Sequence, residues 1–517
     1  ETFAYNHLGL DLENKGIEAD APIHWLSSAV SRDKSHLRLK EDPREASGKY
    51  TDHRNDRISD LDAILDTPEK LHGSMLVGSI LDLNKAFEHK ATKPLFKELL
   101  KKNEVDLVSG GPPCQSFSMA GLREQRNEKN SLPWAFAELV RKTKPKMALL
   151  ENVSGILRAF DDNGKKYHAW YQIAIAFATE GYVPLCLHVN AKYVGAAQNR
   201  PRFIMLSLRK DIAEKIMKGK VDKHFRDALE ESLGFYKAAR KKKELLEFGH
   251  LHCHEAKNDA DLFKSEIFKS LITHKGSEDK LITTKQAIGD LAGEETDLKY
   301  VKLINNKAFN ETAAKQFRIK EWKAQLKNNN ELPDNQTPPN SQGKTKARFR
   351  LYQVMNKLDN SAKKKINSFL RTGDRKALDN QTLNELSSID WLMTPNGVIV
   401  KSLPNHELTT LLEQFLTKKR TQKALVADAP APAALSIPDD ACHYSDKIQR
   451  TLTVREMARF QSFPDWFVFK SKVTTGGKMR RFQVPQYTQV GNAVPPLLGK
   501  ALGKVCKNII NIADIAQ

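Results

Sequence analysis

Short apolar segments alternate with helical patterns in the first half of this chain, and few folds accommodate such an alternation. The apolar segments lie near residues 105–109, 146–150, 183–189 and 202–208, and helical patterns cover 133–142 and 168–180. This order is typical of an α/β fold with a mostly parallel sheet. In such folds the chemistry gathers at the carboxyl ends of the strands.

The first of these expected strands ends in a stiff turn that carries a cysteine. The turn reads Gly110-Gly111-Pro112-Pro113-Cys114-Gln115. Glycines allow a sharp turn and close approach to a ligand, and prolines restrict the backbone. Cys114 is therefore a candidate nucleophile, although a buried structural cysteine would explain the same residue about as well.

Two later segments carry charged side chains at strand positions. Glu151-Asn152-Val153 ends the second expected strand, and Gln198, Arg200 and Arg202 alternate along an extended segment. Alternating residues of an extended chain point to one side, and Pro201 favours extension at the residue before it. Taken separately, a solvated strand end and an exposed strand edge would also account for these residues.

In this order, the three motifs resemble those of the DNA (cytosine-5) methyltransferases, which carry Pro-Cys-Gln, Glu-Asn-Val and Gln-x-Arg-x-Arg. Segments 450–465 and 487–496 extend the resemblance, which covers about residues 75–210 and 440–510. It implies a Rossmann-like S-adenosylmethionine-dependent methyltransferase core with a mostly parallel sheet. It also implies a smaller inserted target-recognition domain.

The reaction of this family explains why such residues are needed. Carbon 5 of cytosine is a weak nucleophile until a thiolate adds to carbon 6, and the added negative charge then needs stabilisation. The resemblance makes Cys114 that nucleophile and places Glu151 at nitrogen 3 and the exocyclic amine. It places Arg202 near oxygen 2 and Arg200 near the backbone or the catalytic loop. The target base would have to leave the duplex to reach these groups.

The segment after Cys114 is polar and contains a glycine. An ordinary surface connection would look the same, but its position matches the loop that closes over DNA in the family. The resemblance implies that Gln115, Ser118 and Gln198 contact the nucleic acid.

The cofactor expected from the resemblance is S-adenosyl-L-methionine. Its expected contacts are Glu1, Ser79, Pro113, Leu132 and Asn492. No Phe-x-Gly-x-Gly loop occurs in the 517 residues, and the chain begins at Glu1, so we expect an N-terminal truncation that removes the first strand and the cofactor loop.

Two of these cofactor contacts have a second interpretation. Ser79 stands where the family usually has aspartate, so nearby Asp82 could substitute for it. Asn492 could also cap the helix that follows it.

Charge and cysteine content agree with this interpretation. The net charge of +20 and the pI of about 9.5 imply a polyanionic partner. The five cysteines, at 114, 186, 253, 442 and 506, form no Cys-x-x-Cys pair, so we expect neither a metal site nor a disulfide framework. No apolar run approaches the ~20 residues of a membrane span. We expect a cytoplasmic monomer that acts on double-stranded DNA, with a cognate restriction endonuclease as a further partner.

We expect residues 1–210 to form the catalytic core, 211–440 the target-recognition insert and 441–517 the return to the core. The insert contains lysine-rich runs at 240–243, 363–365 and 418–420. Two other functions stay open. A tRNA cytosine-5 methyltransferase would carry a Cys-Phe-Thr signature, which the insert lacks. A non-catalytic DNA-binding relative would have lost Cys114, Glu151 or the two arginines.

Overall fold

The computed structural model describes most of the chain, and its described residues fall into two compact units. The described ranges are 2–11, 22–26, 61, 64–102, 104–113, 132–162, 165–242, 246–272, 281–306, 318–321, 323–324, 333–419, 421–433, 441–474 and 484–515. The sheet unit comprises residues 10–194, 200–277 and 497–517, and the second unit comprises 1–9, 195–199 and 278–496. The sheet unit thus extends to 277, beyond the boundary expected at 210. Target recognition by residues 211–440 stays a prediction.

The sheet unit is built on a five-stranded mixed sheet in the order β10-β7-β9-β4-β3. Its strands are β3 (Leu107–Gly110), β4 (Met147–Val153), β7 (Tyr182–Asn190), β9 (Pro201–Arg209) and β10 (Cys253–Glu255). Each of the four expected apolar segments is a strand. β3 pairs with β4 and β10 with β7 in parallel, whereas β9 is antiparallel to both of its neighbours.

The reversal of β9 follows from the length of its connection. Only residues 191–200 join β7 to β9, and a parallel crossover needs a dozen or more residues. The chain therefore turns back on itself. Four of the five strands still run in the same direction, which is the sense in which the sheet is mostly parallel.

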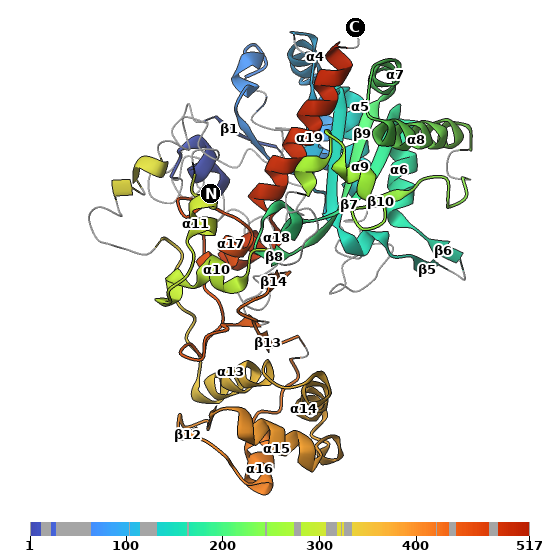
Figure 1. Ribbon diagram of the computed structural model, residues 1–517. Helices are drawn as coiled ribbons and strands as arrows, with labels where there is room; N and C mark the ends of the chain where they lie inside the picture. Colours follow the sequence, from blue (N-terminus) through green and yellow to red (C-terminus); the bar gives the residue numbers. More distant parts are fainter. Residues whose placement is uncertain are drawn as a thin grey trace. The chain divides into compact units, whose positions relative to one another are not determined.

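Helices cover both sides of this sheet (Figure 1). In that view α6 and α8 lie on one side, and α19 lies on the other. Ile173 and Phe177 of α6 are fully buried, as are Leu187 of β7 and Leu206 of β9; each such side chain contributes roughly 1.5–3 kcal/mol of hydrophobic free energy. The helices that accompany this sheet are α5 (Leu132–Thr143), α6 (Ala169–Thr179), α7 (Lys210–Lys218), α8 (Lys223–Lys242), α9 (Ala260–Lys264) and α19 (Pro496–Ile515).

A smaller part of the sheet unit precedes β3. It contains the parallel pair β1 (Ile23–Trp25) and β2 (Met75–Val77), followed by α3 (Ile80–Glu88) and α4 (Lys93–Lys102). Their apolar side chains share one cluster, in which Leu26, Ala86 and Phe96 are buried. The hairpin β5 (Phe160–Asp162) and β6 (Lys165–Tyr167) follows β4.

The second unit contains a segment of buried ion pairs. Its elements include β8 (Gln198–Asn199), β14 (Ala431–Pro432), α10 (Thr284–Ile288), α11 (Lys299–Ile304), α17 (Val454–Phe460) and α18 (Gln486–Asn492). On α17, Arg459 makes a double hydrogen bond to Asp465, with N–O distances of 2.8 and 2.9 Å. Glu456 receives two hydrogen bonds from Arg450, both of 2.8 Å. The charged residues of segment 450–465 are thus engaged in holding this unit together.

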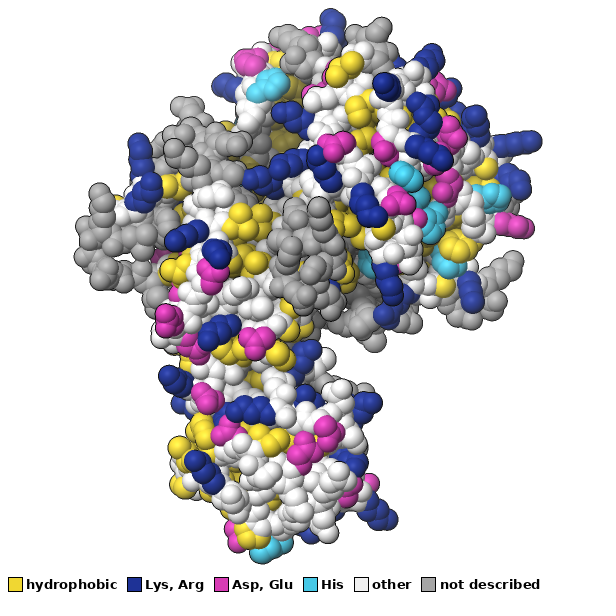
Figure 2. Space-filling model, viewed as in Figure 1, with side chains coloured by type: hydrophobic (Ala, Val, Ile, Leu, Met, Phe, Trp, Pro, Cys, Tyr) yellow, Lys and Arg dark blue, Asp and Glu magenta, His cyan; other side chains and the backbone are white. Residues whose placement is uncertain are grey.

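The second unit also contains a helical lobe, which we define as residues 343–413. Its helices are α13 (Gly343–Met355), α14 (Asn360–Thr372), α15 (Asn380–Ile389) and α16 (Asn405–Glu413), and β11 (Leu392–Met393) pairs with β12 (Ile399–Val400). Nearby, β13 (Lys423–Ala424) pairs with β15 (Ala441–Cys442). Phe349, Ile366, Leu386 and Leu408 lie in the apolar core of the helical lobe. On the face seen in Figure 2, basic side chains of this lobe are scattered among acidic ones.

Short helical turns complete the described structure. They are η1 (Ala4–Leu8), η4 (Pro68–Leu71), η7 (Ser154–Leu157), η8 (Ala191–Val194), η10 (Lys269–Leu271), η12 (Asp290–Ala292) and η14 (Arg375–Ala377). Within the described ranges, we find no helix whose length and apolar character would let it cross a membrane.

Candidate active site

A cavity of about 340 Å³ lies in the sheet unit where β2 and β3 end. This volume is within the range of small-molecule sites. Three residues expected to contact the cofactor, Ser79, Pro113 and Leu132, lie in its wall. Ser79 precedes α3, and its hydroxyl accepts a hydrogen bond from the Leu81 N–H at 3.2 Å.

Asp82 is not part of the wall of this cavity. Its carboxylate is buried and lies 3.7 Å from the Lys85 ammonium, and Asp82 is not among the residues that line the cavity. The cavity wall thus offers the Ser79 hydroxyl and not the Asp82 carboxylate. The role of Asp82 as a substitute for Ser79 stays a prediction.

Glu151 and Arg202 form an ion pair at the end of β4. Arg202 lies opposite Val153 in the antiparallel register, which makes Glu151 its diagonal neighbour on the same face of the sheet. The Arg202 Nε and Glu151 Oε1 atoms are 2.7 Å apart. Burial raises the pKa of Glu151, while the positive charges of Arg202 and Arg200 oppose that increase. Burial is the larger of these effects, so the pKa of the carboxyl group lies above its ordinary value.

Arg200 and Arg202 are both buried, at 2% and 7% exposure. This burial rules out the alternative that they belong to an ordinary exposed strand edge. Burial, together with the charge of Arg202, lowers the pKa of Arg200 to about 9, although Glu151 opposes the change. Asn190 positions this segment, because its Oδ1 accepts the Arg200 N–H at 3.0 Å.

The turn after β3 is fixed to the end of β4. Asn152 donates from Nδ2 to the Pro112 carbonyl oxygen at 3.0 Å. A Cβ atom on Gly111 would lie 3.0 Å from Glu151 Oε2, and one on Gly110 would lie 2.7 Å from the Phe136 ring. Glycine at both positions lets the turn pass close to Glu151 and to α5. Gly111 also lines the cavity, so the carboxylate and the cavity adjoin the same turn.

Sequence reasoning did not single out Asn152, Asn190 or Phe136. Asn152 was visible as the middle residue of Glu-Asn-Val. Its contact with Pro112 joins positions 40 residues apart, and no local pattern reveals such a contact.

Four expected site residues, Glu1, Cys114, Gln115 and Ser118, lie outside the described residues. The other four cysteines are described, and burial raises the pKa of each: Cys253 and Cys506 to about 12, and Cys186 and Cys442 above their ordinary value. They are thiols at neutral pH and poor nucleophiles.

Two expected residues belong to the second unit. Gln198 lies in β8 opposite Ala431 of β14 and is fully buried. Among the residues that the structure describes, its amide nitrogen and oxygen have no hydrogen-bond partner. Asn492 is the last residue of α18 and is exposed. Their roles as ligand contacts stay predictions.

The family comparison agrees with this geometry. Residues 83–508 match the family model of the C-5 cytosine-specific DNA methylases. The chain belongs to this family. Membership confirms the family predicted from the motifs, and with the α/β model it confirms the fold class. The function of this family is the methylation of cytosine in DNA.

The chain is similar to several curated methyltransferases. It is 22% identical over 426 residues to the type II methyltransferase M.DdeI of Desulfomicrobium norvegicum, covering 80% of this chain and 77% of that protein. It is 37% identical over 109 residues to the type II methyltransferase M.HindV of Haemophilus influenzae, covering 21% and 33%. It is 34% identical over 113 residues to the orphan methyltransferase M.SPRI of Bacillus phage SPR, covering 22% and 25%.

Proposed function

We propose that this chain transfers a methyl group from S-adenosyl-L-methionine to carbon 5 of a flipped-out cytosine in a specific duplex DNA sequence. The observation that carries the proposal is the ion pair between Glu151 and Arg202. It lies beside the turn that leads directly into Cys114, and that turn lines the cavity. An acid, a cation and a small-molecule site thus come from one end of one sheet, and Cys114 follows this turn in the sequence.

Each group has a defined task in the proposed reaction. The Cys114 thiolate adds to carbon 6, and the electron pair moves onto nitrogen 3 and oxygen 2. Both atoms are bonded to carbon 2 and lie on one edge of the base, so a paired carboxyl and guanidinium can contact them together. Glu151 shares a proton with nitrogen 3, and Arg202 stabilises the charge on oxygen 2. After methylation a base removes the proton at carbon 5, and the thiolate leaves.

The cavity suits the expected cofactor. It offers apolar walls, the Ser79 hydroxyl and the backbone of the Gly110–Pro113 turn. S-adenosyl-L-methionine supplies an electrophilic methyl group on a sulfonium. We assign Ser79, Pro113 and Leu132 to its binding, because they share this one wall.

We place target recognition in residues 211–440, with the helical lobe as its compact part. Lys364 and Lys418 are exposed there, and lysines on such surfaces attract phosphates. Because M.DdeI and M.HindV are named type II and M.SPRI is named orphan, we propose a site-specific modification enzyme of one of these two kinds. It would act as a monomer on cytoplasmic DNA.

Bisulfite sequencing tests the reaction. The chain, with any coding sequence upstream of Glu1, is expressed in a host that lacks cytosine methylation. One short methylated context is the expected result. A folded protein that binds S-adenosyl-L-methionine but leaves host DNA unmethylated would refute the proposal.

A covalent trap tests the nucleophile. Duplex DNA with 5-fluorocytosine at the target should form a denaturation-resistant complex, because fluorine blocks the release step. Cys114→Ser should form none while keeping its DNA affinity, and Cys253→Ser is the control that should still be trapped. Trapping by Cys114→Ser would remove Cys114 from the mechanism.

A further inference from the structure

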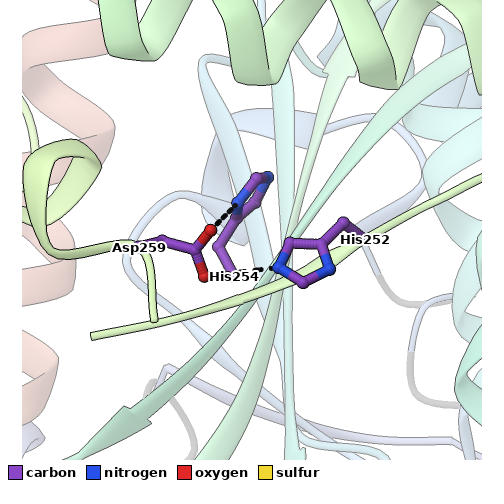
Figure 3. A group of neighbouring side chains, drawn as sticks. All are labelled: His252, His254 and Asp259. Carbon is purple, nitrogen blue, oxygen red and sulfur yellow. Dashed lines mark hydrogen bonds and ion pairs between the residues drawn. The ribbon is translucent and has the colours of Figure 1, made fainter. Parts of the chain in front are cut away.

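Two histidines and an aspartate converge at the edge strand of the sheet unit (Figure 3). His254 lies in the middle of β10 and His252 directly precedes that strand. Residues two apart in an extended chain project to the same face. Asp259 precedes α9, and its carboxylate reaches both rings. One ligand atom from each residue lies within 4.8 Å of the others.

The separations leave room for a metal ion among the three side chains. The distances from His252 Nε2 to Asp259 Oδ2 and from His254 Nδ1 to Asp259 Oδ1 are both 3.3 Å. Charge-assisted hydrogen bonds to a carboxylate are shorter, about 2.7–2.9 Å. Ligand atoms about 2.0–2.1 Å from a tetrahedral metal ion lie about 3.3 Å from one another. The three donor atoms here lie within 4.8 Å of one another, so a small rotation of the side chains would bring them onto one ion.

The surroundings hold these donors in place. The Glu255 N–H donates to Asp259 Oδ2 at 2.8 Å, and the His252 N–H donates to Glu231 Oε1 at 2.7 Å. The Glu255 side chain is also held in place, because its Oε1 lies 2.7 Å from His188 Nδ1. Second contacts of this kind orient metal ligands.

The cluster also faces an acidic cavity of about 300 Å³. His254 and Asp259 line it together with Asp227 and Glu231 of α8 and with Asp261. Figure 2 shows histidine side chains gathered beside acidic ones on the visible face of this unit. The carboxylates attract a cation, and the cavity leaves room for water as a further ligand.

We propose that His252, His254 and Asp259 bind one divalent first-row transition metal ion of the Zn²⁺ type. Two imidazoles and a carboxylate are a donor set that this class prefers. The ion joins β10 to the start of α9 and stabilises the edge of the sheet. It takes no part in methyl transfer, because its cavity shares no lining residue with the candidate active site. The sequence analysis expected no metal site because the cysteines form no Cys-x-x-Cys pair. That argument does not consider histidine and aspartate, so it could not reveal this cluster.

Metal titration of the chelator-treated chain tests the proposal. Zn²⁺ binding by calorimetry should give one equivalent per chain, and Co²⁺ should give the visible absorption of a four-coordinate site. His252→Ala should weaken Zn²⁺ binding at least tenfold. Its imidazole is half exposed, at 50%, so the fold should persist, which thermal melting checks.

His406→Ala is the matched control, because His406 lies on α16 and is 82% exposed. It should bind Zn²⁺ as the unaltered chain does. Absence of stoichiometric binding by the unaltered chain, or equal affinity in His252→Ala, would overturn the proposal. If His252→Ala does not fold, the stoichiometry and Co²⁺ spectrum of the unaltered chain decide the matter.

Discussion

Glu151 sits at the point where charge must be shared during the proposed reaction. Its carboxylate is largely buried against Arg202, and a buried charge keeps its partner in one geometry. Glu151→Gln preserves the shape of the side chain but removes the proton-sharing group. We expect turnover to fall about 10²–10³-fold with DNA affinity nearly unchanged, measured by transfer of labelled methyl groups and by DNA titration.

Glu104→Gln is the control for this change, because Glu104 is half exposed and lies away from the cavity. It should leave turnover unchanged. Equal losses of DNA binding and turnover in Glu151→Gln would indicate that Glu151 supports the fold and does not stabilise the transition state.

Gly111 and Gly110 separate a catalytic effect from a packing effect at adjacent positions. An added Cβ at Gly111 meets the carboxylate of Glu151, whereas one at Gly110 meets the rigid ring of Phe136. Gly111→Ala should slow methyl transfer with little change in melting temperature. Gly110→Ala should cost about 1–3 kcal/mol of stability. The reverse pattern in thermal melting and turnover would contradict this assignment.

At the scale of elements, a buried arginine ties α13 to the chain after α15. Arg350 Nη2 lies 2.8 Å from Asp390 Oδ2, and its guanidinium lies 3.9 Å from the centroid of the Trp391 ring. Burial disfavours the ionised form of Asp390, but Lys357, the Trp391 N–H and Arg350 together lower its pKa to about 2.

This depressed pKa predicts acid sensitivity of the helical lobe. The folded state holds Asp390 ionised more strongly than the unfolded state does, where its pKa is about 3.9. The contribution of ionised Asp390 to the free energy of unfolding is present above pH 4 and is lost as the pH falls towards 2. Asp390→Asn should reduce stability by about 1–3 kcal/mol at neutral pH. The difference in stability between Asp390→Asn and the unaltered chain, measured by thermal melting, should disappear below pH 3. A difference that stays constant with pH would contradict this prediction.

The elements were predictable where the signal was local. The apolar runs that became β3, β4, β7 and β9 could be read directly, because buried strands have few polar residues. The direction of β9 could not be read from its own composition, which is the same in either orientation. The packing of α8 and β10 against β7 was also missed, since it joins segments far apart in the chain.

The site was predictable to the same extent. The motif residues Glu151 and Arg202 were named from their order in the sequence. Their ion pair depends on the register between β4 and β9, which only the folded sheet sets. The turn at Gly110–Pro113 was expected to be stiff, but its hydrogen bond to Asn152 was not.

At the scale of the whole molecule, the net charge of +20 predicts a salt-dependent affinity for DNA. The lysine runs are only partly available for it, because Lys363 donates to the Asn356 carbonyl and Lys365 to Asp379. Lys364→Gln combined with Lys418→Gln should lower the slope of log K against log salt by about 0.9 for each phosphate that the protein no longer neutralises.

Lys97→Gln combined with Lys101→Gln is the matched control, since both lysines are exposed on α4 of the sheet unit, outside residues 211–440. It should leave the slope unchanged. Equal slopes for both double variants, in DNA titrations at several salt concentrations, would remove Lys364 and Lys418 from DNA binding.

The sheet unit is assembled from three separate stretches of chain, and its last stretch, α19, is synthesised after the 219 residues from 278 to 496. At ~5–20 residues per second, a nascent chain waits about 10–45 s between completing the strands and receiving the helix. Contacts such as Ser270 Oγ with the Ala501 carbonyl and Lys146 with Asp514 cannot form during that time. A chain stopped at residue 496 should therefore be cleaved within the sheet unit by a protease that spares the longer chain. The sheet unit would then become complete only after α19 has been synthesised, well after its strands.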